Sequence, residues 1–244
     1  MTHKTPHRKN IFEHFYNQIS KPFSIILAKT WLTPNQITII SGVFGFYGAY
    51  LLTKGQYIDL LYGAIFIQLY TILDLVDGDI ARMKNLQSNF GKWLDIIFDK
   101  LNDFFIILGL SVGVYLRSGE VVYLYLGIVL MGASFFIQFF MIMNKNIYND
   151  IESNFDIRIS TPKEGLIINL ASDKFKLFNN IRCFISTHFM LEHSTFLFLV
   201  SFFCILNMAQ LALWFLAVHS IISIIYTTMH AGFRIFLLES RYKG

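Results

Sequence analysis

The chain has 244 residues, of which 55% are apolar and 17% aromatic, whereas only 15% are Asp, Glu, Lys or Arg. Soluble domains carry nearer a quarter charged residues, so this composition excludes an ordinary soluble domain and predicts an integral membrane protein. The net charge of +4 comes without a basic stripe interleaved with aromatics, which argues against a nucleic-acid-binding protein.

The segment 11–29 has the pattern of an amphipathic helix. Its apolar residues recur at helical spacing: Ile11, Phe15, Ile19 and Phe23. This pattern is typical of a helix that lies at a membrane surface, and Pro22 is expected to kink or divide it. We therefore expect residues 1–29 to form a cytoplasmic N-terminus with a juxtamembrane helix, followed by one membrane domain over residues 30–244.

The first membrane span is predicted at residues 35–52. Thr33 suits the N-cap position, and Pro34 suits the first helical turn. Small residues recur at every third position of this span: Gly42, Gly45 and Gly48. They predict close packing against neighbouring helices.

Five further stretches are long and apolar enough to cross a bilayer. They are residues 57–82, 91–116, 121–143, 188–206 and 208–236. Residues 144–187 form the longest polar interruption, where short surface helices are expected. The predicted fold class is an all-α integral membrane protein, with six transmembrane helices preceded by an amphipathic surface helix.

The distribution of cations predicts the orientation. If the N-terminus is cytoplasmic, six spans place every Lys and Arg on the cytoplasmic side except Lys54 and Arg117. This bias favours cytoplasmic N- and C-termini. The polar residues between 74 and 99 then lie at the cytoplasmic edge of the membrane.

Four aspartates interrupt the apolar pattern of the second and third spans. Asp74 and Asp77 are three residues apart, and Asp95 and Asp99 are four apart, so each pair shares one face of its helix. Two helices joined by a short turn can direct all four carboxylates at one point. Carboxylates in apolar surroundings need cationic partners, and hard oxygen ligands suit Mg²⁺ or Mn²⁺. The sequence therefore predicts a two-metal site.

Small and basic residues beside the aspartates fit a phosphate ligand. Gly78 and Ala81 leave room against the helix backbone, and Arg82 can then contact phosphate. Alternatively, Arg82 pairs with Asp79 three residues before it. The four aspartates have an alternative too, which is structural ion pairing with nearby lysines, namely Lys84, Lys92 or Lys100. That alternative leaves the two small residues unexplained.

This stretch resembles the signature of the CDP-alcohol phosphotransferase family. The signature is Asp, two residues, Asp-Gly, two residues, Ala-Arg, eight residues, Gly, three residues, Asp, three residues, Asp, and residues 74–99 match every fixed position. The family also has six spans, cytoplasmic termini and a surface helix before the first span. Its Pro-Asn…Thr start to that span is matched by Pro34, Asn35 and Thr38.

The resemblance implies a reaction of phospholipid synthesis. A CDP-linked alcohol, in most relatives CDP-diacylglycerol, gives its substituted phosphate to the hydroxyl of a second alcohol, and CMP leaves. The four aspartates would hold two Mg²⁺ or Mn²⁺ ions, and Asp99 would also be the general base. The implied CDP contacts are Gly78, Ala81 and Arg82, with Asn35 and Ser88 as further candidates. The resemblance also implies a homodimer.

The third span, which reads GKWLDIIFDKLND at its start, is similar to the branch of the family that uses inositol phosphates. A phosphorylated acceptor needs cations in its pocket. The candidate acceptor contacts are Asp103, Arg158, Lys163, Arg182 and Arg234. Each cation is also explained by the orientation bias, and Asp103 by a buried pair with Lys100 or Arg234.

The histidines near the last two spans show no metal-ligand spacing, and we expect them to make helix contacts. They are His188, His193, His219 and His230. Three other functions remain open. They are a family member with a CDP-headgroup donor and a lipid acceptor, a cation- or proton-coupled transporter, and an inactive scaffold of the same fold.

Overall fold

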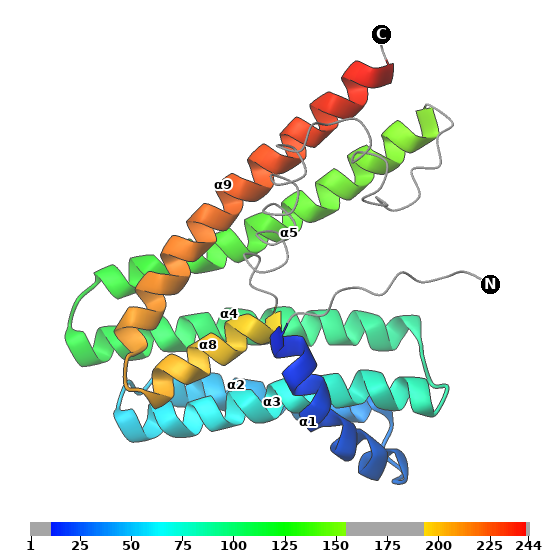
Figure 1. Ribbon diagram of the computed structural model, residues 1–244. Coiled ribbons are helices and arrows are strands. Elements are labelled where there is room, and N and C mark those ends of the chain that lie inside the picture. The colour runs from blue at the N-terminus through cyan, green and yellow to red at the C-terminus, as the bar shows by residue number, and fades with distance from the viewer. Residues whose placement is uncertain (1–10, 155–192, 243–244) are drawn as a thin grey trace. The chain divides into compact units, whose positions relative to one another are not determined.

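The computed structural model describes residues 11–154 and 193–242, and every regular element in these ranges is an α-helix. Figure 1 labels them: α1 Ile11–Ala28, α2 Pro34–Leu52, α3 Tyr57–Met83, α4 Asn89–Ser118, α5 Val122–Asn154, α8 His193–Ile205 and α9 Ala209–Tyr242. The predicted all-α class is therefore confirmed. Most of the predicted polar interruption at 144–187 lies outside the described residues.

Three stretches of the described helices are long and apolar enough to cross a membrane. They are Tyr57–Met83 in α3, Val122–Asn144 in α5 and Ala209–Phe233 in α9. Helices α2, α4 and α8 occupy the other three predicted spans, and their crossing stays a prediction. The predicted orientation of the termini stays a prediction as well.

The described residues group into two compact units. The first takes its residues from Met1–Val129 and Leu191–Ala217, and the second from Leu130–Met190 and Val218–Gly244. All helices from α1 to α4, together with α8, belong to the first unit. The converging aspartates described below lie within this first unit. The predicted domain boundary after residue 29 stays a prediction.

Helix α1 packs against α3 and α8 and runs obliquely across α3 (Figure 1). It continues without a break through Pro22, so of the two predicted effects of this proline the division of the helix is wrong, whereas a kink stays a prediction. The missing proline N–H costs a hydrogen bond, but side chains on the inner face attach α1 to α3. Tyr16 donates to Gln68, and Ser24 donates to Asp79 at 3.1 Å. The outer face exposes apolar side chains, among them Phe15, Phe23, Ile25 and Ile26.

The start of α2 follows the predicted capping pattern. The Thr33 hydroxyl accepts the backbone N–H of Gln36, and the Gln36 side chain accepts the backbone N–H of Thr33 at 2.9 Å. Pro34 opens the helix, where no N–H is needed. Because the side chains of Thr33 and Gln36 satisfy these two backbone N–H groups locally, α2 begins at a defined residue.

Helix α2 is central to the first unit, because α3 and α4 both pack against it. Its glycines make these contacts close, as predicted. Gly42 and Gly45 face α4, where Gly45 lies against Asn102, whereas Gly48 lies against Gly63 of α3. Small residues allow helix backbones to approach in this way. The glycine stripe therefore lets both α3 and α4 pack close to α2.

Backbone atoms of both helices take part in the contact between α2 and α4. A Cβ atom at Gly113 of α4 would collide with the carbonyl oxygen of Leu52, and one at Gly109 would collide with that of Ala49. A backbone carbonyl within a helix cannot move aside as a flexible side chain can. These two glycines therefore hold α4 against the second half of α2.

We expect Gly113→Ala to destabilise the protein by roughly 1–3 kcal/mol, the usual cost of overpacking. The matched control is Gly132→Ala in α5, because a Cβ there would meet no described atom within 4 Å. The control should be neutral or slightly stabilising, since alanine restricts the unfolded chain. Thermal unfolding of both variants in the same detergent compares them, and equal melting temperatures would contradict the close contact.

Candidate active site

Three carboxylates from α3 and α4 converge in the first unit. One oxygen atom from each of Asp74, Asp95 and Asp99 lies within 4.8 Å of the other two, and all three residues are partly buried. The spacing within each helix puts these side chains on the inner faces, and α2 holds the two helices in place. Three hard oxygen ligands at this separation can hold a divalent cation.

Asp77 lies outside this group of three and has its own partner. It is 6% exposed, and its Oδ2 atom accepts a hydrogen bond from the hydroxyl of Thr38 in α2. The Thr38 hydroxyl also lies 3.2 Å from the carbonyl oxygen of Pro34. The Pro-Asn…Thr start of α2 thus holds a carboxylate of α3. The role of Asp77 as a metal ligand stays a prediction.

Two of the three lysines named as possible partners of the aspartates, Lys84 and Lys100, make other contacts. The Lys84 ammonium donates to the carbonyl oxygens of Thr30 and Leu32, at 2.7 and 2.8 Å, and so attaches the α1–α2 turn to the end of α3. Lys100 pairs with Asp103 at 3.2 Å. The structure therefore gives no support to the alternative that Lys84 or Lys100 neutralises the converging aspartates.

Gly78 leaves an open position beside the converging carboxylates. Among the described atoms, a Cβ at Gly78 would meet only the guanidinium of Arg82, at an ordinary contact distance of 3.7 Å. Arg82 pairs with Asp79 at 2.6 Å, as the alternative reading of this arginine predicted. Its side chain is nevertheless 64% exposed, so several of its donors remain available to a ligand.

The first turns of α2 and α4 meet at Gly91. Ser88 caps α4 by accepting the backbone N–H of Gly91 at 2.9 Å. A Cβ at Gly91 would lie 2.9 Å from Oδ1 of Asn35 and 3.1 Å from Oγ of Ser88, so only glycine leaves space for both side chains. Helix N-termini favour anions. This arrangement supports the predicted phosphate contacts, although the contacts themselves stay predictions.

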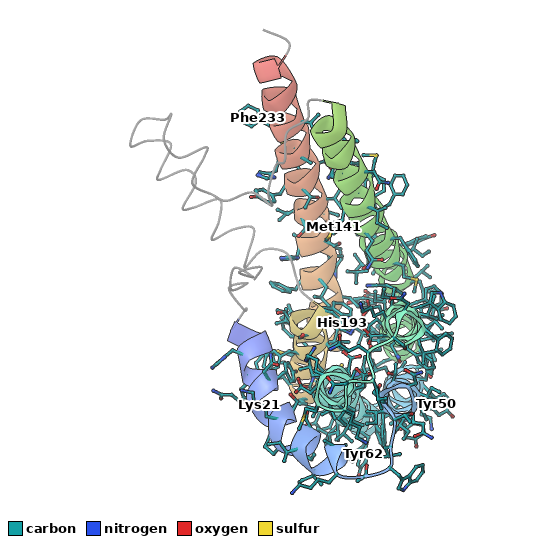
Figure 2. The ribbon with its side chains drawn as sticks, turned by 90° about the vertical axis from the view of Figure 1, so that its right-hand side faces the viewer. Lys21, Tyr50, Tyr62, Met141, His193 and Phe233 are labelled. Carbon is teal, nitrogen blue, oxygen red and sulfur yellow. The ribbon has the colours of Figure 1, made fainter. Side chains whose placement is uncertain are left out.

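Two residues that the sequence analysis did not select adjoin the carboxylates. Tyr70 of α3 is fully buried and donates its hydroxyl hydrogen to Oδ1 of Asp99 at 2.8 Å. His193 opens α8 (Figure 2), and its Nε2 atom lies 3.1 Å from the Tyr70 hydroxyl. Its Nδ1 atom lies 3.0 Å from Oδ1 of Asp103.

The sequence analysis missed His193 because this contact is far from local. Tyr70 and His193 are 123 positions apart in the chain. The expectation of a helix contact was correct, since His193 joins α8 to α3 and α4, but its place beside Asp99 was not foreseen. The local signal that could have indicated it is a polar residue at the start of an otherwise apolar helix.

The predicted acceptor contacts are only partly described. Asp103 is paired with Lys100 and His193, in line with the predicted buried pair. Arg234 belongs to α9, but its side chain lies outside the described part. The remaining candidates also lie outside the described residues: Arg158, Lys163 and Arg182.

The residues of the candidate site lie within a region that matches a known family. The profile of the CDP-alcohol phosphatidyltransferase family matches residues 31–225. A phosphatidylinositol phosphate synthase of Corynebacterium glutamicum is 32% identical over 85 residues, which cover 35% of this chain and 38% of that protein. A "Bifunctional IPC transferase and DIPP synthase" of Aquifex aeolicus is 33% identical over 79 residues, or 32% of this chain and 18% of that protein. The chain therefore spans less than half the length of these two relatives.

Solved structures share the fold. The phosphatidylinositol phosphate synthase of Mycobacterium tuberculosis with CDP-DAG bound superposes with a TM-score of 0.61 at 19% identity, over 88% of this chain and 94% of that one. The same protein in complex with manganese and citrate gives a TM-score of 0.53, over 87% of this chain and 88% of that one. At this level of identity the likeness establishes a common fold.

We expect the purified protein to bind Mn²⁺ and Asp95→Asn to weaken that binding. Asp95→Asn should lower the Mn²⁺ affinity by more than the roughly 10- to 100-fold that is usually lost when a hydrogen-bonding partner of a metal ligand is removed. The matched control is Asp59→Asn, in the first turn of α3 at the other end of the helix. Electron paramagnetic resonance of Mn²⁺ measures both affinities, and equal values for the two variants would contradict a metal site at Asp95.

Proposed function

The chain belongs to the CDP-alcohol phosphatidyltransferase family, and on this premise we propose that it transfers a substituted phosphate group from a CDP-alcohol to the hydroxyl of a polar acceptor, releasing CMP. The donor that we propose is CDP-diacylglycerol, which places the enzyme in phospholipid synthesis. The observation that carries the proposal is the convergence of Asp74, Asp95 and Asp99 within a complete family signature.

The proposed reaction is an in-line displacement at phosphorus. The acceptor oxygen bonds to the phosphorus that carries the donor alcohol, and the bond from that phosphorus to the bridging oxygen of CMP breaks. The proton of the acceptor hydroxyl passes to Asp99, the proposed general base. Mg²⁺ or Mn²⁺ held by the four signature aspartates would neutralise the diphosphate.

The donor site that we propose lies where α2, α3 and α4 begin or end close together. The open position at Gly78 and the small side chain of Ala81 admit the nucleotide, and the exposed guanidinium of Arg82 contacts phosphate. Asn35 and Ser88, brought together at the first turns of α2 and α4, add polar contacts. Support for this placement comes from the absence of a described side chain next to Gly78 other than Arg82.

We propose an inositol phosphate as the acceptor. The names of the Corynebacterium and Mycobacterium relatives support this choice, as does the pattern at the start of α4. We further propose a six-span homodimer with both termini in the cytoplasm, and an active site at the cytoplasmic edge of the membrane. The cations Arg158, Lys163, Arg182 and Arg234 remain the proposed acceptor contacts, together with Asp103.

A second candidate within the family is a CDP-headgroup donor with a lipid acceptor. The Aquifex relative is named differently from the phosphatidylinositol phosphate synthases, so the assay below also includes a second class of CDP-linked donor. A cation- or proton-coupled transporter is the competing class of function. It is less well supported because the converging acids lie toward one end of α3 and of α4, rather than at the middle of both helices.

We expect purified protein with Mn²⁺ to release CMP from CDP-diacylglycerol when the correct acceptor is present. The acceptor panel contains inositol phosphate, inositol, glycerol phosphate and serine, and inositol phosphate should give the largest rate. Asp99→Asn should lower kcat by about 10²–10⁴-fold, the usual contribution of a general base. The Asp59→Asn variant is the control, and coupled detection of CMP measures the rates.

The same assay separates the candidates. CMP release from a CDP-headgroup with a lipid acceptor would replace the proposed donor by the second candidate. If protein that binds Mn²⁺ releases no CMP from any donor, the transferase proposal is overturned, and transport assays in proteoliposomes would follow.

We expect Gly78→Ala to raise KM for the CDP donor by about tenfold or more, because a methyl group would occupy the proposed nucleotide position. The fold should not suffer, since the added Cβ meets only the flexible end of Arg82 at 3.7 Å. Thermal unfolding and initial rates measured on one preparation separate the two effects. The control is again Gly132→Ala, and an unchanged KM for Gly78→Ala would contradict the donor site.

A further inference from the structure

We propose that His193 is a positioning residue that acts through Tyr70 to fix the orientation of the Asp99 carboxylate. The inference rests on the proposed function in one respect, because it takes Asp99 as the residue that faces the reaction. The observations that carry it are the contacts of the His193 ring, which reach α3 on one side and α4 on the other.

The hydrogen-bond directions follow from the number of available hydrogens. Tyr70 has one hydroxyl hydrogen and donates it to Oδ1 of Asp99 at 2.8 Å. Its oxygen must then accept from its other neighbour, Nε2 of His193, at 3.1 Å. The chain of contacts therefore runs from His193 through Tyr70 to Asp99, with each oxygen accepting from the residue before it.

The opposite side of the His193 ring is held as well. Its Nδ1 atom lies 3.0 Å from Oδ1 of Asp103, whose Oδ2 pairs with Lys100 at 3.2 Å. The ring also packs edge-on against Tyr70, with centroids 5.9 Å apart and an interplanar angle of 82°. The contact of Nε2 with the Tyr70 hydroxyl, the edge-on packing against Tyr70 and the close approach of Nδ1 to Asp103 together orient the ring, although Nδ1 and Oδ1 of Asp103 make no hydrogen bond of good geometry.

These contacts distinguish the two oxygens of Asp99. Tyr70 addresses Oδ1, and the nearest approach of His193 to the carboxylate, 3.7 Å, is also to Oδ1. The hydrogen bonds of the described residues leave Oδ2 free. One oxygen is thus held by the protein, while the other remains for a cation or for the acceptor hydroxyl. Precise orientation of this kind is what partners of functional carboxylates provide.

The test compares two substitutions that each preserve one half of the histidine. The amide nitrogen of glutamine reaches approximately where Nε2 lies, whereas that of asparagine reaches where Nδ1 lies. We expect His193→Ala to lower kcat by about 10- to 100-fold, with KM for the CDP donor within about twofold of wild type. His193→Gln should restore most of kcat, whereas His193→Asn should remain as slow as His193→Ala.

A double-mutant cycle tests whether His193 acts through Tyr70. Tyr70→Phe removes the donor to Asp99 and should lower kcat by a similar factor. The double variant should be no slower than the slower single variant, because both changes break the same chain of contacts. The matched control is His14→Ala on the exposed side of α1, where the imidazole contacts only Gln18 among the described residues, and it should leave kcat unchanged.

Mn²⁺ binding without any substrate gives a second readout. We expect His193→Ala to weaken Mn²⁺ binding by about tenfold while the melting temperature in detergent stays close to that of wild type. This readout remains informative even if the wild-type protein releases no CMP, so failure of the proposed function is separate from failure of this inference.

Three results would overturn the inference. The first is a His193→Ala variant with kcat and Mn²⁺ affinity within threefold of wild type. The second is rescue by asparagine and not by glutamine, which would assign the effect to the Asp103 contact. The third is additive losses in the Tyr70→Phe, His193→Ala pair, which would mean that the two residues act independently.

Discussion

The structure depends on holding like charges close together in apolar surroundings. Carboxylate oxygens of Asp74, Asp95 and Asp99 lie within 4.8 Å of one another on partly buried side chains. Desolvation and mutual repulsion each cost several kcal/mol per buried charge unless a cation offsets them. Helix packing must supply the rigidity that keeps these carboxylates together, since Lys84 and Lys100 make other contacts.

Helix α2 supplies that rigidity although it contributes none of the three converging carboxylates. Gly48 of α2 meets the backbone of α3, two glycines of α4 meet the backbone of α2, and the Thr38 hydroxyl holds Asp77 from the side. The ends of α3 and α4 are fixed as well. Lys84, at the end of α3, donates to the α1–α2 turn, and Ser88 caps the start of α4. The acidic faces therefore meet because other contacts in the unit, the glycine contacts of α2 and the Lys84 hydrogen bonds among them, hold the helices close together.

The sequence predicted the parts of this arrangement that are encoded locally. Capping at Thr33, the close contacts of Gly45 and the shared faces of the aspartates all follow from spacings of a few residues. Pro22 does not divide α1, because its local cost is outweighed by the packing of α1 on α3. His193 could not be predicted, since its position depends on where α8 begins relative to a helix more than a hundred residues earlier.

The signature residues are thus necessary for the site but do not determine all of it. Its eight fixed positions lie on α3 and α4, whereas partners of these residues come from α2 and α8 directly and from α1 through Asp79. Ser24 of α1 contacts Asp79, which also holds Arg82, and Thr38 of α2 contacts Asp77. His193 of α8 approaches Asp99. The geometry of the site therefore depends on the packing of α1, α2 and α8 around α3 and α4 as well as on the signature itself.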